Sequence, residues 1–81
     1  MIRPNRCTLL LIDDAEEDRA VYRRYLEQNR ECLYRILEAE TGAQALQVAA
    51  EHRPDCILLV YRLPDADGLT LLARLTRQSV E

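Results

Sequence analysis

The 81-residue sequence predicts an α/β fold, in which a short parallel sheet is covered by helices on both faces to give three layers. Three apolar runs of strand length alternate with three segments that repeat apolar residues at helical spacing. The first run, residues 7–12, is nearly continuous in apolar residues, as in a parallel strand that is buried on both faces. The resulting order βαβαβα requires right-handed crossovers, and we expect residues 1–81 to form one small domain.

The first half of the chain contains two predicted strands and one predicted helix. Residues 7–12 form an apolar run that stops at two aspartates, and residues 33–39 have strand-like composition. Residues 15–29 carry three acids in their first turn, where the helix dipole favours negative charge. We expect one face of this helix to be formed by Ala15, Asp18, Val21, Tyr22, Tyr25 and Leu26.

A capping box of Thr41 and Gln44 predicts the start of a second helix, with Ala45, Leu46, Ala49 and Ala50 on one face. Pro54 ends this helix, and His52 near its end is typical of a charge that complements the helix dipole.

Residues 55–61 form the most hydrophobic run and should be the third strand. Proline and glycine then predict a turn over residues 63–68. We expect Asp67 to cap a last helix that has Leu69, Leu72 and Leu75 along one face.

Composition excludes several classes of protein. The net charge is -3 and the arginines are scattered, which disfavours nucleic-acid binding. No run approaches the ~20 apolar residues of a membrane span, and no signal peptide is present, so we expect a cytoplasmic protein. The odd number of cysteines (Cys7, Cys32 and Cys56) predicts reduced thiols. Cys7 and Cys56 lie in apolar runs, so we expect them to pack as small hydrophobes.

Acidic residues mark a candidate site at the carboxyl ends of the strands, where open α/β sheets bind ligands. Asp13 and Asp14 end the first strand, and Val60 nearly ends the third. Paired carboxylates of this kind are able to hold Mg²⁺. The alternative, which we favour, is structural: Asp14 caps the first helix and Asp13 is a solvated acid at a strand end.

Two motifs together are specific for one family. They are Leu-Ile-Asp-Asp (residues 11–14) with Glu17, Asp18 and Arg19 following, and Leu-Leu-Val-Tyr-Arg-Leu-Pro-Asp-Ala-Asp-Gly (residues 58–68). In both, the chain resembles the receiver domains of bacterial two-component response regulators, the CheY-like family. The resemblance implies a flavodoxin-like fold with strand order 2-1-3, truncated after the third of five βα units. A fourth strand with its hydroxyl residue and a fifth with its lysine would be missing.

The resemblance also implies site residues. The family carries its phosphoacceptor aspartate where this chain has Val60, which has no oxygen to phosphorylate. The family's Mg²⁺ ligands would correspond to Asp13, Asp14 and the backbone carbonyl of Arg62, with the central carboxylate lost. Weak Mg²⁺ binding or no cofactor at all is therefore expected.

The implied function is that of a degenerate receiver module of a two-component phosphorelay, not an enzyme. It would act through protein–protein contacts, and we expect a homodimer that pairs the third strands of two copies. The interface would be formed by Cys56, Ile57, Leu58, Leu59 and Val60. An aspartate at position 60 would carry an unpaired charge at a dry interface, so valine suits it.

Alternatives remain open. A substitute acid such as Asp65 or Asp14 would make the chain a phosphorylated switch, and a fragment would have no independent function. A histidine kinase could dock on the first helix at Tyr22, Arg23 and Tyr25, although these residues equally suit an ordinary amphipathic helix. The pair Asp65 and Asp67 lacks the later glutamate of an EF-hand calcium loop, so turn and cap roles are favoured.

Overall fold

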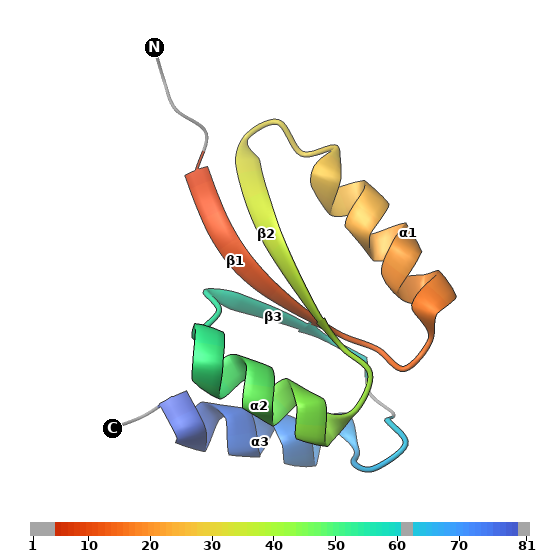
Figure 1. The fold of residues 1–81 in the computed structure, drawn as a ribbon, viewed down its shortest axis with the longest axis vertical. Helices are drawn as coiled ribbons and strands as arrows, with labels where there is room; N and C mark the ends of the chain where they lie inside the picture. The colour runs from red at the N-terminus through yellow and green to blue at the C-terminus, as the bar shows by residue number, and fades with distance from the viewer. Residues whose placement is uncertain (1–4, 61–62, 80–81) are drawn as a thin grey trace.

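Strands and helices alternate along the chain in the predicted order (Figure 1). A computed structural model describes residues 5–60 and 63–79. The elements are β1 (Asn5–Ile12), α1 (Glu16–Glu27), β2 (Cys32–Ala39), α2 (Gly42–His52), β3 (Cys56–Leu59) and α3 (Gly68–Ser79). The third strand is shorter than predicted, and Tyr61 lies outside the described residues.

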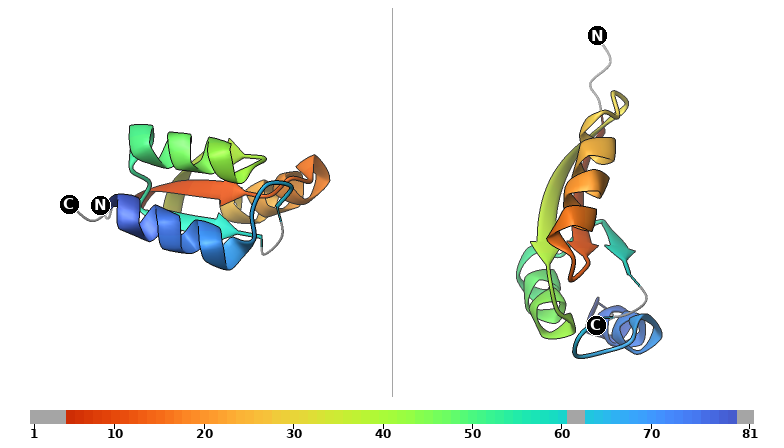
Figure 2. Two further views of the ribbon diagram at one scale, coloured as in Figure 1. Left: turned by 90° about the horizontal axis from the view of Figure 1, so that it is seen from below. Right: turned by 90° about the vertical axis from the view of Figure 1, so that its right-hand side faces the viewer.

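The three strands form a parallel sheet of order β2-β1-β3, which confirms the predicted topology. Helix α1 lies on one face of the sheet, whereas α2 and α3 lie side by side on the other (Figures 1 and 2). The three-layer arrangement is therefore confirmed. None of the helices in the described ranges is long and apolar enough to cross a membrane.

The main core lies between the sheet and the α2–α3 layer. It is formed by Leu10, Ile12, Ala39, Ala45, Leu71 and Leu75. Because alternate side chains of a strand point to opposite faces, Leu9 and Leu11 of β1 are buried on the α1 face instead. β1 is thus buried on both faces, as its continuous apolar sequence predicts.

The buried face of α3 differs from the predicted one. Leu75 is buried as expected, but its partner is Leu71, one helical turn earlier. Leu69 is 68% exposed and Leu72 is 47% exposed. Leu71 and Leu75 pack with core residues of α2 and β1, so Leu69 and Leu72 point away from the core.

The predicted face of α1 is also wrong in part. Leu26 is half-buried, but Val21, Tyr22 and Tyr25 are exposed. The fully buried residue of this helix is Arg19, which is tied to the ends of β1 and β2 by hydrogen bonds. The polar contacts of Arg19 therefore set which side of α1 faces the sheet.

The predicted caps of the other two helices are confirmed. The Gln44 N–H donates to Thr41 Oγ1 (3.1 Å) at the start of α2, and the Thr70 N–H donates to Asp67 Oδ1 (2.8 Å) at the start of α3. The Gln44 side chain reaches back to the N–H of Glu40 and not to that of Thr41. The C-cap residue that follows α2 is Arg53, whose φ of 45° is left-handed, and Pro54 comes directly after it.

Candidate functional site

The ends of β1 and β3 meet at the edge of the sheet where the acidic pair lies. The Val60 N–H donates to the Ile12 carbonyl (3.0 Å), so the pairing of β3 with β1 continues one residue beyond the strand. The register matches Ile12 with Leu59, and its next pair is Asp13 with Val60. The structure therefore brings the apolar Val60 next to the first of the two aspartates.

Asp13 is a buried acid, not the solvated strand-end acid of the structural alternative. Its side chain is 2% exposed, and its Oδ1 accepts a hydrogen bond from the Ala15 N–H (2.9 Å). This contact, two residues along the chain, is an Asx-turn that holds the start of α1. Asp14 is exposed, and the N-cap is Ala15 without a side-chain cap, so the prediction that Asp14 caps this helix is wrong.

The second oxygen of Asp13 has no partner in the part of the chain that the structure describes. Its Oδ2 is buried and makes no hydrogen bond there. Buried polar atoms in native proteins nearly always have a partner, so this oxygen marks a place for a donor or a cation. It is the one feature of the site that favours metal binding.

The remaining donors do not complete a Mg²⁺ site. Mg²⁺ needs near-octahedral oxygen ligands, including one or two carboxylates. Val60 supplies no side-chain oxygen, and the Arg62 carbonyl lies outside the described residues. Within residues 5–60 and 63–79, no group of three or more His, Cys, Asp or Glu side chains is placed to hold a metal ion. At this edge, the described residues therefore supply the carboxylates of Asp13 and Asp14 but no third carboxylate.

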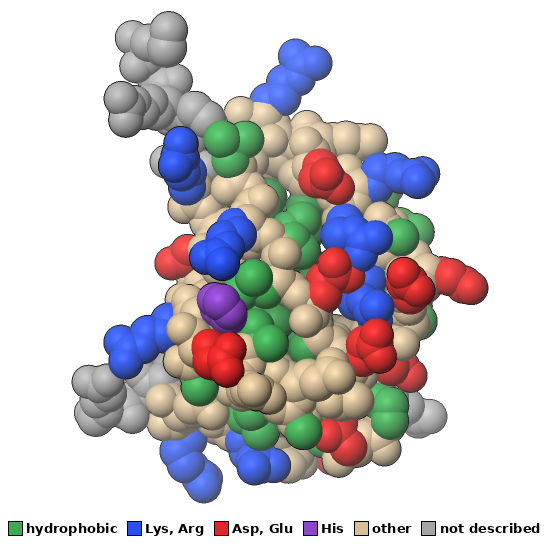
Figure 3. Space-filling view, in the orientation of Figure 1, with side chains coloured by type: hydrophobic (Ala, Val, Ile, Leu, Met, Phe, Trp, Pro, Cys, Tyr) green, Lys and Arg blue, Asp and Glu red, His purple; other side chains and the backbone are tan. Residues whose placement is uncertain are grey.

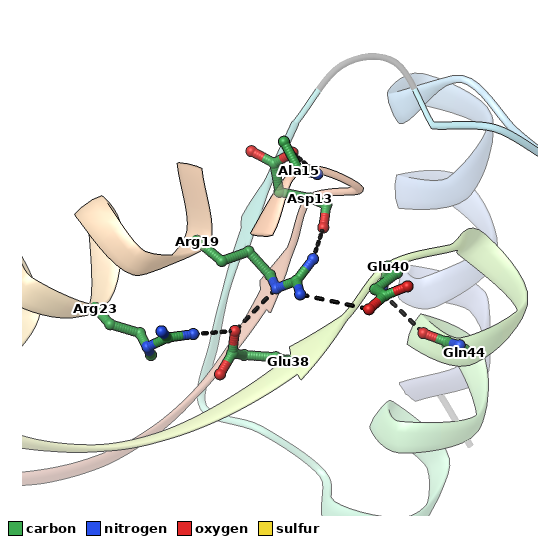
Figure 4. Close-up of polar contacts among 7 residues, drawn as sticks. All are labelled: Asp13, Ala15, Arg19, Arg23, Glu38, Glu40 and Gln44. Atoms are coloured by element: carbon green, nitrogen blue, oxygen red, sulfur yellow. Dashed lines mark hydrogen bonds and ion pairs between the residues drawn. The ribbon is translucent and has the colours of Figure 1, made fainter. Parts of the chain in front are cut away.

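Arg19 links the ends of β1 and β2 (Figure 4). It is 6% exposed, and its Nη1 donates to the Asp13 carbonyl (2.7 Å) while its Nε donates to Glu38 Oε1 (2.9 Å). Nη2 lies 3.4 Å from Glu40 Oε1. Arg23, one turn later, pairs with the same carboxylate of Glu38. Arg19 was not among the predicted site residues. The signal in the sequence was the spacing of four residues between Arg19 and Arg23, together with two acids, Glu38 in a strand and Glu40 directly after it.

Asp65 caps a helix that is distant in sequence. Its Oδ1 accepts from the Gly42 N–H (2.7 Å) and its Oδ2 accepts from the Ala43 N–H (3.0 Å), both in the first turn of α2. These two backbone hydrogen bonds hold the pKa of Asp65 below its usual value. A Cβ at Gly42 would lie 3.2 Å from Asp65 Oδ1, so glycine permits the close approach. With both oxygens bound to backbone amides, Asp65 is poorly placed to attack a phosphoryl group.

The outer edge of β3 carries the residues predicted to form an interface. Ile57 is 36% exposed and Leu58 is 39% exposed, whereas Cys56, Leu59 and Val60 are half-buried. Among the described residues, β3 pairs with β1 alone. In the view of Figure 3, charged side chains of both signs are interspersed with apolar ones, without a patch of one sign.

Candidate residues at two other positions, the end of α2 and the outer face of α1, have ordinary surroundings. His52, at the end of α2, lies exposed with its Nε2 3.9 Å from Glu51 Oε2. Tyr22 and Tyr25 are exposed on α1, so this face is open to a partner. Neither position forms part of the cluster around Asp13.

Comparison with known proteins identifies the family. The model of the response regulator receiver domain matches residues 9–81, which is most of the chain. The chain belongs to the response regulator receiver family. The receiver motifs that the sequence shares with the family, around Asp13 and Asp65, lie at the carboxyl ends of the strands or directly after them.

Several relatives are transcriptional regulators. This receiver is 34% identical to the transcriptional regulatory protein SrrA of Staphylococcus aureus over 83% of the chain and 27% of that protein. It is 48% identical to KdpE of Mycobacterium tuberculosis over 52% of the chain and 19% of that protein. The chain thus spans about a fifth to a quarter of the length of these relatives.

A solved receiver domain shows the same arrangement of elements. The signal receiver domain of the putative response regulator NarL of Mycobacterium tuberculosis superposes with a TM-score of 0.81 at 30% identity. The match covers 95% of this chain and 61% of the NarL chain. Receiver domains are signalling modules, and this receiver has their fold.

Proposed function

We propose that this receiver is not phosphorylated at the end of β3 and acts in two-component signalling through protein–protein contacts. The observation that carries the proposal is Val60, which stands next to Asp13 where the family has its phosphoacceptor. Phosphoryl transfer needs a nucleophilic oxygen, and valine has none. In this proposal the module is not an enzyme. It also works without a resident cofactor, because Asp13 and Asp14 alone would hold Mg²⁺ weakly.

Labelling with a small phosphodonor tests the proposal. The protein is incubated with acetyl phosphate and Mg²⁺, beside a receiver domain that is known to accept phosphate, and the intact masses are measured. We expect the reference receiver to gain the mass of a phosphoryl group and this chain to gain none. A stable phosphoryl adduct at Asp14 or Asp65, located by peptide mapping and abolished by the corresponding substitution to asparagine, would overturn the proposal.

The proposed contact is between the β3 strands of two copies. Unpaired N–H and C=O groups along a strand edge favour pairing with another strand, and residues 56–60 carry no charge that would oppose it. A two-fold axis at this edge gives one continuous sheet of order 2-1-3-3′-1′-2′. Exposed Ile57 and Leu58 then become buried. A stable dimer of this kind should bury at least about 1,200 to 2,000 Å².

A charge at the strand edge tests this contact. Leu58→Lys puts an ammonium group on the edge of β3, where it opposes strand pairing. Val21→Lys is the matched control, because Val21 is also exposed but lies on α1, which packs on β2 at the opposite side of the sheet. We expect only Leu58→Lys to shift the protein to monomer. Equal dimerisation of both variants would exclude β3 as the contact.

A further inference from the structure

Two cysteine sulfurs are in contact at the end of the sheet that is remote from Asp13. Cys7 lies near the start of β1 and Cys56 is the first residue of β3, and their Sγ atoms are 3.2 Å apart. The two residues are separated by 49 positions in the sequence, so the parallel register of β1 and β3 brings them together. Both are free thiols in this structure.

The two side chains share one face of the sheet. Cys56 is in register with Leu9, and Cys7 lies two residues before Leu9, so all three point to the α1 face. Both cysteines are partly exposed, so a small oxidant is able to reach the sulfurs. A disulfide needs the sulfurs to approach to about 2.0 Å, a movement of roughly one ångström from the observed contact.

We propose that Cys7 and Cys56 form a dithiol site that a peroxide oxidises to an intramolecular disulfide between β1 and β3. The Cys56 thiolate attacks one oxygen of hydrogen peroxide, the O–O bond breaks, and hydroxide leaves to give a sulfenic acid. The Cys7 sulfur then attacks the sulfur of Cys56, and the sulfenic oxygen leaves with the Cys7 proton as water. Two thiols lose two electrons in total, and the peroxide is reduced to water.

The surroundings of the two sulfurs indicate which of them attacks the peroxide and which attacks the sulfenic acid. The hydrogen bond with Cys56, burial, and the negative charges of Cys56 and Asp55 raise the pKa of the Cys7 thiol to about 11, although a hydrogen bond with Cys32 acts in the opposite direction. Cys7 therefore keeps its proton at neutral pH. Because the thiolate is the nucleophile, we assign the attack on the peroxide to Cys56 and the resolution of the sulfenic acid to Cys7.

Cys32 is the competing partner of Cys7. It lies on β2, where it is in register with Asn5, is also a partly exposed free thiol, and makes a hydrogen bond with Cys7. Its strand is on the other side of β1 from β3. If the 3.2 Å contact of Cys7 with Cys56 governs the chemistry, the Cys7–Cys56 link should exceed the Cys7–Cys32 link.

Peptide mapping of the folded, oxidised protein tests the proposal. Trypsin separates the three cysteines into residues 7–19, 31–35 and 36–62, because Arg53 precedes a proline and is not cleaved. After treatment with hydrogen peroxide, we expect the peptides 7–19 and 36–62 to be joined, with the loss of two hydrogen atoms from the intact chain. The link should form in Cys32→Ser and disappear in both Cys7→Ser and Cys56→Ser.

Oxidation in urea separates geometry from reactivity. In the unfolded chain all three pairings should form, whereas the folded chain should give the Cys7–Cys56 link in at least about tenfold excess. The proposal is overturned if the folded protein gives the same mixture as the unfolded one, or gives only links between two copies of peptide 36–62. The mass of the intact chain shows that the link lies within one chain. The result therefore does not depend on whether β3 mediates dimerisation.

Discussion

The guanidinium of Arg19 donates a 2.7 Å hydrogen bond to the backbone carbonyl of Asp13, inside the protein. The same side chain binds Glu38 on β2, so one residue of α1 holds the ends of two strands. It fixes the backbone of the acidic segment that follows β1, and it explains why the aromatic residues of α1 face outward.

Replacement of Arg19 should destabilise the fold. Arg19→Ala leaves the Asp13 carbonyl without this donor and removes one of the two arginine partners of Glu38, so we expect a loss of about 2–4 kcal/mol in the free energy of unfolding. Arg23→Ala is the control, since Arg23 is more exposed and contacts Glu38 alone among the charged groups of Figure 4; it should cost less than about 1 kcal/mol. Urea unfolding of both variants checks this, and equal losses would refute the role of Arg19.

The capping of α2 by Asp65 predicts a dependence of stability on pH. The Gly42 and Ala43 N–H groups lower the pKa of Asp65 in the folded state. The stabilisation is therefore complete above the unfolded pKa of about 4 and is lost as pH falls through the lower folded pKa. Asp65→Asn should melt at a lower temperature than the wild type at pH 7, and the difference should close in acid. A constant difference in melting temperature between Asp65→Asn and the wild type across pH would contradict this role of Asp65.

The face of α3 that packs on the sheet is tested by two neighbouring leucines. Leu71 is fully buried in the main core, whereas Leu72 is exposed. Leu71→Ala should lower the free energy of unfolding by about 2–5 kcal/mol, and Leu72→Ala should change it by less than about 1 kcal/mol. The comparison is made by urea unfolding at a protein concentration where the chain is monomeric. A larger loss of unfolding free energy for Leu72→Ala than for Leu71→Ala would mean that α3 packs with the face predicted from the sequence, which contains Leu72.

A disulfide between Cys7 and Cys56 should stabilise the chain. It closes a long loop, and loop closure of this kind typically adds about 2–4 kcal/mol. For a domain of this size, the melting temperature should rise by an amount on the order of 10 °C. Thermal unfolding of the oxidised and reduced wild type measures the shift, with Cys7→Ser given the same treatment as the control. A fall in the melting temperature would mean that the link strains the sheet.

The topology was predictable because the chemistry that determines it is local. The nearly continuous apolar run in residues 7–12 and the strand-like composition of residues 33–39 indicate strands, and Thr41 and Asp67 mark helix starts by their own side-chain hydrogen bonds. These features depend on neighbouring residues along the chain. The strand order 2-1-3 pairs segments that are distant in the sequence, and it was predicted from the family resemblance instead.

The site was less predictable because it depends on contacts between segments that are distant in the sequence. Asp13 and Asp14 are equivalent in the sequence, and only the packing of α1 shows that Asp13 is buried and Asp14 exposed. The capping of α2 by Asp65 and the contact of Cys7 with Cys56 both require the register of β3 against β1. The face of α1 was wrong because a buried arginine does not follow the apolar periodicity.

Absolute molar mass across a dilution series tests most directly whether this receiver acts by assembly through its third strand. The wild type and Val60→Asp are compared by size-exclusion chromatography with light scattering, in reducing buffer. We predict a dimer for the wild type, and weaker dimerisation for Val60→Asp because the aspartate would bury an unpaired charge. A compact wild-type monomer at all concentrations would contradict assembly through the third strand. If Val60→Asp dimerises as well as the wild type, Val60 is not part of the interface.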